Sequence, residues 1–401
     1  MMGEDMKRFN RIVMVVLDSV GTGAAVDAKK DGNQRAELLG HGFQQFQGRL
    51  QLPTLTALGL ANISRDAPLS GMSMAHPLTS YVGRIQPAAG YSDSLTAYWE
   101  MMGLSIQRPL QTFPTGLAAK FVKQIEKFTN RKVILNGRSS IGDAINDYGL
   151  QQTQEGDIIV LTSSDSILQV SANQAVVSRN ELYRICRFIR FVADKNNLRL
   201  GRIIARPFAG EAPSNFILAG GRRDYAMIPP GNTVLDLLTG SDVPVIGIGK
   251  VDDIFANHGI DKSISLLNSD DRLTRLITVM EEQAFGLIMT DLGDFEASNG
   301  DRLGSQGYGE KLMRVDRQLG EIINQLKPTD LLIITADHGN DQTSNRTRHT
   351  REFVPLIAAS PNAHGGQLGT RRTFSDIGAT ILENFGIPSQ FPGTSFLNQI
   401  S

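Results

Sequence analysis

Short apolar runs alternate with longer amphipathic stretches along this chain of 401 residues, and that alternation constrains the fold more than any other feature. Short runs of apolar, often β-branched residues are typical of buried strands, whereas apolar residues spaced three and four apart are typical of helices. The predicted strands are Arg11–Leu17, Asp157–Thr162, Arg202–Ala205, Val243–Ile248, Ala284–Met289, Asp330–Ile334 and Val354–Ala358. The predicted helices include Arg179–Asn196, Arg272–Glu282, Gly309–Leu326 and Ser375–Phe385. The pattern predicts an α/β protein in which helices flank a mostly parallel sheet.

Two segments rich in proline and glycine interrupt this alternation. Gln107–Pro114 holds two prolines, and Gly220–Pro230 holds a Gly-Gly pair and a Pro-Pro pair. The segment between them has strands and helices of its own, and at roughly 150 residues per domain the chain is long enough for two or three domains. We expect a core domain made of residues 1–107 and 226–401, with residues 108–225 forming a smaller inserted α/β domain.

Charge and cysteine content argue against several classes of protein. The formal net charge is −1 and the basic residues are scattered, so nothing indicates a nucleic-acid or membrane surface. No apolar run approaches the roughly 18 residues of a membrane span, and Ile12–Leu17 is too short for the apolar region of a signal peptide. The one cysteine, Cys186, cannot form an internal disulfide and falls on the apolar face of a predicted helix. We therefore expect a cytoplasmic protein.

An Asp-His pair follows one of the predicted strands. Asp337 and His338 come shortly after the apolar run that begins at Asp330, and His349 lies on the loop that follows. Open α/β sheets bind ligands at the carboxyl ends of their strands, and neighbouring carboxylate and imidazole groups suit a divalent metal. A helix cap or a hydrogen-bonded buried histidine is the alternative interpretation. The second histidine favours metal binding.

Acidic residues follow two other predicted strands, and a serine lies at the start of a helical pattern. Asp18 and Asp291 end strands, and Asp93 is expected to cap a helix over residues 95–103. Ser94 would then lie in the first turn, where unpaired N–H groups and the helix dipole favour an anion. A hydroxyl there, beside metal ions, is a good phosphoryl acceptor. Taken singly, each residue has a simpler explanation, since Asp18 could end a strand and Ser94 could cap a helix.

Nine short motifs distributed along the chain are a stronger indication than any single residue. They are Val16-Leu-Asp-Ser-Val-Gly21, Ser94-Leu-Thr-Ala-Tyr-Trp-Glu-Met-Met-Gly103, Thr162-Ser-Ser-Asp-Ser-Ile-Leu-Gln169, Gly201-Arg-Ile-Ile-Ala-Arg-Pro-Phe208, Gly247-Ile-Gly-Lys250, Gln306-Gly-Tyr-Gly-Glu310, Thr335-Ala-Asp-His-Gly-Asn-Asp341, His349-Thr-Arg-Glu352 and Gly393-Thr-Ser-Phe-Leu397. In this order they closely resemble the phosphopentomutase family of the alkaline phosphatase superfamily, from about Arg11 to Leu397. The resemblance implies an alkaline-phosphatase-like core that binds metal, with a smaller inserted cap domain.

The resemblance also implies a role for particular residues. The nucleophile would be Ser94, and the first divalent ion would be held by Asp18, Asp337 and His338 together with the nucleophile's oxygen. The second ion would be held by Glu296, Asp301 and His349. The sugar phosphate would be contacted by Ser163, Asp165, Arg202 and Lys250. A ribose hydroxyl needs an acceptor such as a carboxylate, and a distal phosphate needs cations.

Three of these positions depart from the family pattern. Ser94 stands where the family has threonine, Glu296 where it has aspartate and Asp301 where it has histidine. All three substitutes can still perform the expected chemistry. A carboxylate in place of an imidazole adds a negative charge and favours Mg²⁺ or Mn²⁺ over Zn²⁺. We expect two divalent ions, Mn²⁺ before Mg²⁺, with a divergent second site.

Three functions remain open at this point. The first is a phosphopentomutase-like phosphotransferase that interconverts ribose or deoxyribose 1-phosphate and 5-phosphate through phosphorylated Ser94 and a sugar bisphosphate. The second is a related metal-dependent mutase or phosphatase with another phosphorylated substrate. The third is a non-catalytic protein whose second site has lost its metal. The complete set of first-site residues argues against the third.

Overall fold

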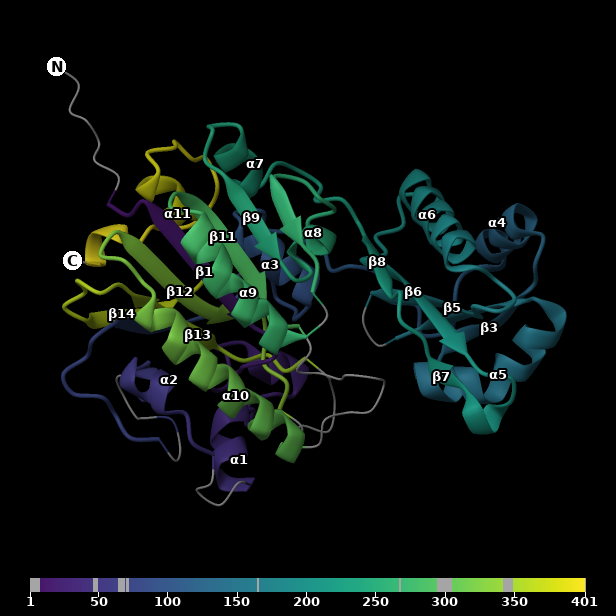
Figure 1. Cartoon of the computed structure of the whole chain (residues 1–401), viewed down its shortest axis with the longest axis horizontal. Helices are drawn as coiled ribbons and strands as arrows, with labels where there is room; N and C mark the ends of the chain where they lie inside the picture. Colours follow the sequence, from purple (N-terminus) through teal and green to yellow (C-terminus); the bar gives the residue numbers. More distant parts are fainter. Residues whose placement is uncertain are drawn as a thin grey trace. The chain divides into compact units, whose positions relative to one another are not determined.

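The chain forms two compact units in this computed structural model (Figure 1). The larger unit is built mainly from residues 1–107 and 229–401, and the smaller unit from residues 108–228. The crossings between them therefore fall within the two proline- and glycine-rich segments. The structure describes residues 8–45, 50–63, 69, 72–163, 166–266, 268–293, 305–341 and 349–400.

The larger unit is built on an eight-stranded sheet with the order β10-β9-β11-β1-β12-β13-β2-β14. Its strands are β10 (Lys262–Ile264), β9 (Val245–Ile248), β11 (Gly286–Asp291), β1 (Arg11–Leu17), β12 (Asp330–Ala336), β13 (Val354–Ala359), β2 (Tyr81–Ile85) and β14 (Gly366–Arg371). Seven of these strands run in one direction, and only β13 is reversed, antiparallel to both β12 and β2. The mostly parallel sheet predicted from the sequence is confirmed.

The middle of this sheet is buried on both faces. Every residue of β1, β11 and β12 is buried, as expected of parallel strands covered by helices on either side. In Figure 1, α9 (Ser269–Glu282) and α10 (Ser305–Asn324) cross the near face, and the two helices contact each other. A second group of helices packs around α11, namely α3 (Ser94–Met101), α7 (Val234–Thr239) and α11 itself (Ser375–Asn384). The predicted α/β fold class is therefore correct.

The register of the central strands brings their carboxyl ends together. In the parallel pairing of β1 with its two neighbours, Val16 lies opposite Asp291 and Leu17 lies opposite Ala336. The residues that follow these strands therefore meet at one edge of the sheet. At the opposite edge, the guanidinium of Arg11 forms an ion pair with Asp330, and both side chains are almost fully buried. This ion pair joins the beginnings of β1 and β12, at the opposite end of the strands from their carboxyl ends.

The smaller unit has its own mixed sheet, in the order β3-β4-β5-β6-β7 with β8 paired to β6. Its strands are β3 (Val133–Arg138), β4 (Ile158–Thr162), β5 (Ile167–Asn173), β6 (Arg202–Ala209), β7 (Ile217–Leu218) and β8 (Arg223–Ala226), and its helices are α4 (Ala119–Thr129), α5 (Ile141–Glu155) and α6 (Arg179–Lys195). One apolar cluster contains side chains of α4 and α6, including the fully buried Cys186, as the sequence predicted. A second cluster joins α5 to Phe208 of β6. The unit thus has an apolar core separate from that of the larger unit.

Several of the helices, such as α4, α6 and α10, are amphipathic. The longest described helix is α10, with 20 residues, and it places Leu312, Val315, Leu319 and Ile322 in the core. These positions are spaced three and four apart, the pattern of a helix that is buried along one stripe. Within the described part of the chain, no helix combines the length and the apolar character that crossing a membrane requires.

Candidate metal centre

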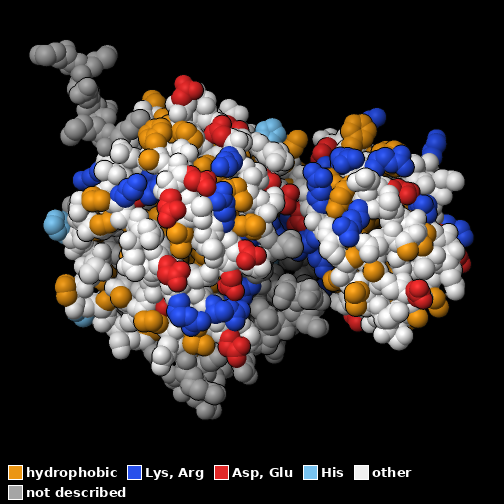
Figure 2. Space-filling view, in the orientation of Figure 1, with side chains coloured by type: hydrophobic (Ala, Val, Ile, Leu, Met, Phe, Trp, Pro, Cys, Tyr) orange, Lys and Arg blue, Asp and Glu red, His pale blue; other side chains and the backbone are white. Residues whose placement is uncertain are grey.

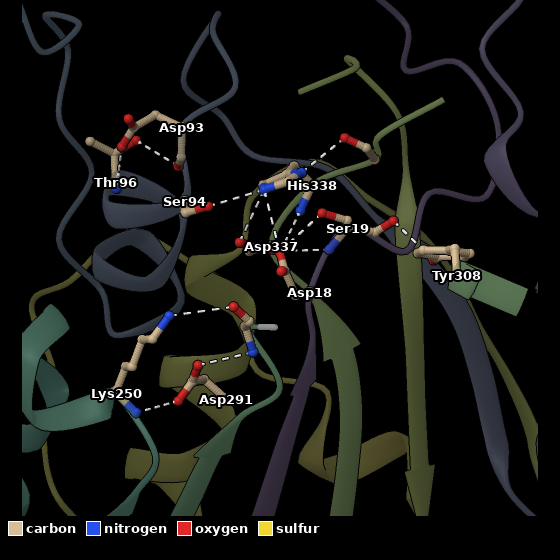
Figure 3. Close-up of polar contacts among 12 residues, drawn as sticks. Asp18, Ser19, Asp93, Ser94, Thr96, Lys250, Asp291, Tyr308, Asp337 and His338 are labelled. Carbon is tan, nitrogen blue, oxygen red and sulfur yellow. Dashed lines mark hydrogen bonds and ion pairs between the residues drawn. The ribbon is translucent and has the colours of Figure 1, made fainter. Parts of the chain in front are cut away.

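Three side chains with metal-ligating atoms lie together at the carboxyl edge of the larger sheet (Figure 3). Asp18 follows β1, and Asp337 and His338 follow the neighbouring strand β12. One oxygen or nitrogen from each of the three lies within 4.8 Å of the others, and all three residues are buried. Nε2 of His338 is 3.3 Å from Oδ2 of Asp337 and 3.7 Å from Oδ1 of Asp18. We call these three residues the metal-ligand cluster.

The hydrogen bonds of His338 leave its Nε2 lone pair facing this cluster. Nδ1 lies 2.8 Å from the carbonyl oxygen of Gly339. A carbonyl can only accept, so Nδ1 donates and, in the neutral ring, Nε2 carries the lone pair. A histidine that donates its other ring N–H to a backbone carbonyl is the usual arrangement in metal sites. Two carboxylates with one such imidazole suit a divalent cation, so the donor set fits the metal implied by the sequence.

Ser94 lies beside the cluster at the beginning of α3. Asp93 adopts extended backbone angles and its side chain accepts a hydrogen bond of 3.0 Å from the amide of Thr96, which confirms the predicted helix cap. Oγ of Ser94 is 3.0 Å from Nε2 of His338. Because that nitrogen is the acceptor, the serine hydroxyl donates. The sequence placed a hydroxyl at a helix start next to metal ligands, and the structure brings the two together.

Ser19 fixes the two carboxylates of the cluster from the opposite side. Its amide donates to Oδ1 of Asp337 at 3.2 Å, and its hydroxyl donates to Oδ1 of Asp18 at 3.0 Å. Ser19 has a φ of 61°, so the chain turns sharply as it leaves β1. The hydroxyl of Tyr308 donates to the carbonyl of Ser19 at 3.1 Å. Burial, followed by the charges of Asp18, Glu352 and Asp337, raises the pKa of Tyr308, so this phenol stays a donor.

Glu352 connects the loops that carry the ligands, a role that the sequence did not indicate. Its carboxylate accepts hydrogen bonds from the hydroxyl of Thr350 at 2.5 Å and from the amides of Gly23 at 3.2 Å and Leu38 at 3.0 Å. A Cβ atom on Gly21 would come within 2.2 Å of this carboxylate. Burial is the main cause that raises the pKa of Glu352 to about 7. The His-Thr-Arg-Glu motif was the only signal for this residue.

His349 lies against the metal-ligand cluster. Its ring stacks on that of His338, with centroids 3.7 Å apart and planes 19° apart, and its side chain is buried. It was predicted to hold a second ion together with Glu296 and Asp301, which lie outside the described residues. His349 is therefore the one predicted second-site residue that the structure places, and it places it next to the first site.

Lys250 lies at the same edge of the sheet, on the loop that follows β9. Its ammonium donates to the carbonyl of Gly293 at 3.4 Å, and its backbone amide donates to Oδ1 of Asp291 (Figure 3). Asp291 was expected among the acidic residues at strand ends. The structure turns its carboxylate toward Lys250 and Arg272, and it is not part of the metal-ligand cluster.

Two predicted substrate contacts lie at one edge of the smaller unit's sheet. Ser163 follows β4 and Arg202 begins β6; the intervening strand β5 is antiparallel to β4 and parallel to β6. The end of β4 and the beginning of β6 therefore share an edge. Asp165 lies outside the described residues.

Comparison with known proteins identifies relatives along nearly the whole chain. The family model of the metalloenzyme superfamily matches residues 10–389. A phosphopentomutase of Limosilactobacillus reuteri (strain DSM 20016) is 42% identical over 395 residues, which cover 98% of this chain and 99% of the relative. A phosphopentomutase of Levilactobacillus brevis is 42% identical over 394 residues, covering 98% of this chain and 100% of the relative.

Solved structures with low sequence similarity were also found. A protein in the alkaline phosphatase superfamily from Vibrio parahaemolyticus matches with a TM-score of 0.42 at 10% identity, covering 98% of this chain and 70% of that chain. A protein from Pyrococcus horikoshii matches with a TM-score of 0.45 at 13% identity, covering 97% of this chain and 100% of that chain.

Proposed function

This chain belongs to the phosphopentomutase family within the metalloenzyme superfamily and is a metal-dependent phosphotransferase, and on that premise we propose that phosphorylated Ser94 carries the interconversion of ribose or deoxyribose 1-phosphate and 5-phosphate. Two relatives that carry the name phosphopentomutase, each 42% identical over nearly the full chain, support the activity. We propose further that the reaction passes through a phosphoserine and a sugar bisphosphate.

One observation carries this route. The hydroxyl of Ser94 lies in the first turn of α3 and donates to Nε2 of His338, an atom of the metal-ligand cluster. A phosphoryl group on this oxygen would meet the unpaired N–H groups at the helix start, which favour a dianion. A serine that only capped the helix would not be needed, because Asp93 already caps it.

Asp18, Asp337 and His338 would hold the first divalent ion, and we assign Glu296, Asp301 and His349 to a second one. When bound, such ions supply Lewis acidity that lowers the pKa of a nearby hydroxyl and offsets the charge of the phosphoryl oxygens. The protein's own part is to hold the serine oxygen. Ser19 and the carbonyl of Gly339 fix the cluster's side chains, so that Ser94 faces groups that do not have to reorganise.

The transfer proceeds in two halves. The phosphoryl group of phosphorylated Ser94 passes to the free hydroxyl of the sugar monophosphate, which leaves a serine hydroxyl and a sugar bisphosphate. The bisphosphate then turns, and its other phosphoryl group passes to Ser94, which releases the isomeric monophosphate. The phosphate count is unchanged, so a resting phosphoserine is regenerated in each cycle.

We assign recognition of the sugar phosphate to Lys250 in the larger unit and to Ser163, Asp165 and Arg202 in the smaller one. The smaller unit is basic, with 17 Lys and Arg residues against 10 Asp and Glu between residues 108 and 228. Figure 2 shows Lys and Arg side chains over its visible face. Since the chain as a whole has a net charge of −1, this excess is local and suits a phosphorylated ligand.

The test is conversion of ribose 1-phosphate to ribose 5-phosphate, followed by ³¹P NMR with Mn²⁺ or Mg²⁺ and a sugar bisphosphate primer. We expect Ser94→Ala to abolish turnover and the phosphoserine signal in intact-mass spectra. The matched control is Ser375→Ala, since Ser375 is also a serine at the first position of a helix, α11, and lies outside the metal centre; Ser375 is buried, whereas Ser94 is half-buried.

Two outcomes would contradict the proposal. Full activity of Ser94→Ala would remove the phosphoserine route. Release of inorganic phosphate in place of ribose 5-phosphate would favour the alternative, a metal-dependent phosphatase or a mutase of a different phosphorylated substrate.

A further inference from the structure

The buried carboxylate of Asp291 joins two loops at the carboxyl edge of the larger sheet (Figure 3). Its Oδ1 accepts a hydrogen bond from the backbone amide of Lys250, on the loop after β9. Its Oδ2 accepts one of 3.1 Å from the amide of Gly293, on the loop after β11. These two strands are neighbours in the sheet, so one side chain fixes the exits of both.

The packing around this carboxylate leaves no room for a side chain at Gly249 or at Gly293. A Cβ atom on Gly249 would lie 2.3 Å from Oδ1 of Asp291, and a Cβ atom on Gly293 would lie 2.7 Å from Oδ2. Gly249 also has a φ of +89°, a conformation that residues with a side chain rarely adopt. The carboxylate therefore occupies space between two glycines, and both loops close around it.

A buried arginine neutralises Asp291. Nη1 of Arg272 lies 3.0 Å from Oδ2 and 3.0 Å from the backbone carbonyl of the same residue, and the side chains of the pair are 0% and 2% exposed. A buried ion pair of this kind is rarely a large net source of stability, because desolvation offsets most of the attraction. The ion pair does orient the carboxylate of Asp291, since the guanidinium holds it in one position.

The side chain of Lys250 is a further neighbour of this arrangement. Its ammonium reaches across the same two loops to the carbonyl of Gly293 at 3.4 Å. Asp291 therefore contacts the Lys250 amide directly and also binds the amide of Gly293, the residue whose carbonyl accepts from the Lys250 ammonium.

We propose that Asp291 is a positioning residue for the phosphotransferase reaction, which orders the Lys250 and Gly293 loops so that the Lys250 ammonium is held ready for the substrate's phosphate. The inference rests on the proposed function in one respect, the role of Lys250 in binding the sugar phosphate. The ordering of the two loops is independent of any substrate.

The first experiment measures loop order without substrate. Amide hydrogen exchange of the metal-loaded protein is compared between wild type and Asp291→Asn. The asparagine amide can still accept from Lys250 but presents N–H groups to Gly293 and Arg272. We expect faster exchange in peptides that cover residues 246–254 and 288–293. Unchanged exchange in both would overturn the proposal.

The matched control is Asp330→Asn. Asp330 is also paired with a buried arginine, Arg11, but at the opposite edge of the same sheet. The Asp330→Asn substitution removes the same charge from an equally buried ion pair. It should lower the free energy of unfolding without accelerating amide exchange in those two peptides. If both variants accelerate exchange there equally, the effect is general loosening and the proposal fails.

The second experiment separates binding from chemistry. Kinetics with ribose 1-phosphate should show a KM raised roughly tenfold or more in Asp291→Asn, with kcat changed less. Outer-shell partners that orient metal ligands typically matter by roughly 10- to 100-fold, and we expect an effect of similar size for a partner that orients a binding lysine. Lys250→Met should raise KM similarly, and adding Asp291→Asn to it should add little, because the lysine that Asp291 positions is already gone. If the two substitutions raised KM independently, so that their effects multiplied in the double variant, the inference would be contradicted.

The two proposals can fail separately. If Lys250→Met leaves KM unchanged, the substrate role assigned to Lys250 is wrong, whereas the exchange comparison still decides whether Asp291 orders the loops. If Asp291→Asn does not fold, the double variant Asp291→Asn with Arg272→Met replaces it, because removing both members of a buried ion pair leaves no unpaired charge.

Discussion

The imidazole ring of His349 stacks on that of His338, with ring centroids 3.7 Å apart. The stack thus brings a predicted ligand of the second ion next to a predicted ligand of the first, and both residues belong to the connection between β12 and β13.

Removing His349 is expected to lower metal content without abolishing it. In His349→Ala the metal-ligand cluster of Asp18, Asp337 and His338 remains, so the protein should retain about one equivalent of Mn²⁺, whereas we expect the wild type to hold two. His338→Ala should lose the first ion as well, since its Nε2 faces both carboxylates. Metal analysis after dialysis measures both.

The control for these variants is His258→Ala, because His258 is exposed and no motif includes it. It should leave the metal content at the wild-type value. An unchanged content in His349→Ala would show that this ring packs against the centre without binding metal.

The pH dependence of stability should carry the signature of Glu352. Burial raises the pKa of Glu352 from 4.5 to about 7, so the folded protein holds more protons than the unfolded chain between these values. The free energy of unfolding should therefore fall as the pH rises through this window, by at most about 3 kcal/mol from this residue. Below the window the carboxyl is protonated in both states. Above it the carboxyl is ionised in both states, and the folded protein bears the full free-energy cost of burying the charge.

Urea unfolding of the wild type and Glu352→Gln at about pH 4.5 and about pH 8 tests this, with the pH window taken from the pKa shift. EDTA is included because a bound cation changes the pKa values around it. The stability of the wild type relative to the variant should decrease at the higher pH. A difference that is the same at both pH values would contradict the raised pKa.

A methyl group at Gly21 should disturb the metal centre through Glu352. The new Cβ would lie 2.2 Å from a carboxylate oxygen, so Glu352 must move away from Gly23 and Leu38. Gly21→Ala is expected to cost roughly 1–3 kcal/mol, as overpacking usually does, and to weaken Mn²⁺ binding because Asp18 lies on the same loop.

Gly42→Ala is the matched control, since Gly42 lies in α1 (Leu38–Gln45) and a Cβ there meets nothing within 4 Å. Alanine in a helix interior should stabilise by roughly 0.5–1 kcal/mol. Thermal unfolding measures both variants. Equal behaviour of the two would mean that Glu352 has room to adjust.

The strands that the sequence predicted are those with continuous apolar runs. β1, β12 and β13 were found because burial on both faces demands apolar residues at successive positions. β14 was missed, and so was β5, because their residues include Gly366, Gln367, Gln169 and Asn173, which break the pattern. Both depend on pairing with neighbours more than on their own residues.

Part of the centre was also predictable from local signals. Asp18, Asp337 and His338 were named because they follow buried strands, and parallel strands bring such residues to one edge. Asp93 was named because Asp is a favoured helix cap. The roles assigned to Glu296, Asp301 and Asp165 remain predictions from family resemblance, as does the cytoplasmic location from composition.

The sequence by itself determined which residues end the strands and therefore which side chains can reach the metal centre, because a strand and its exit are set by consecutive residues. Only the tertiary structure decided what supports them. Glu352 accepts from amides 329 and 314 residues away, at Gly23 and Leu38. Asp291 meets the Lys250 amide 41 residues away. No local pattern encodes these contacts, since each forms where loops that are far apart in the sequence meet at the edge of one sheet.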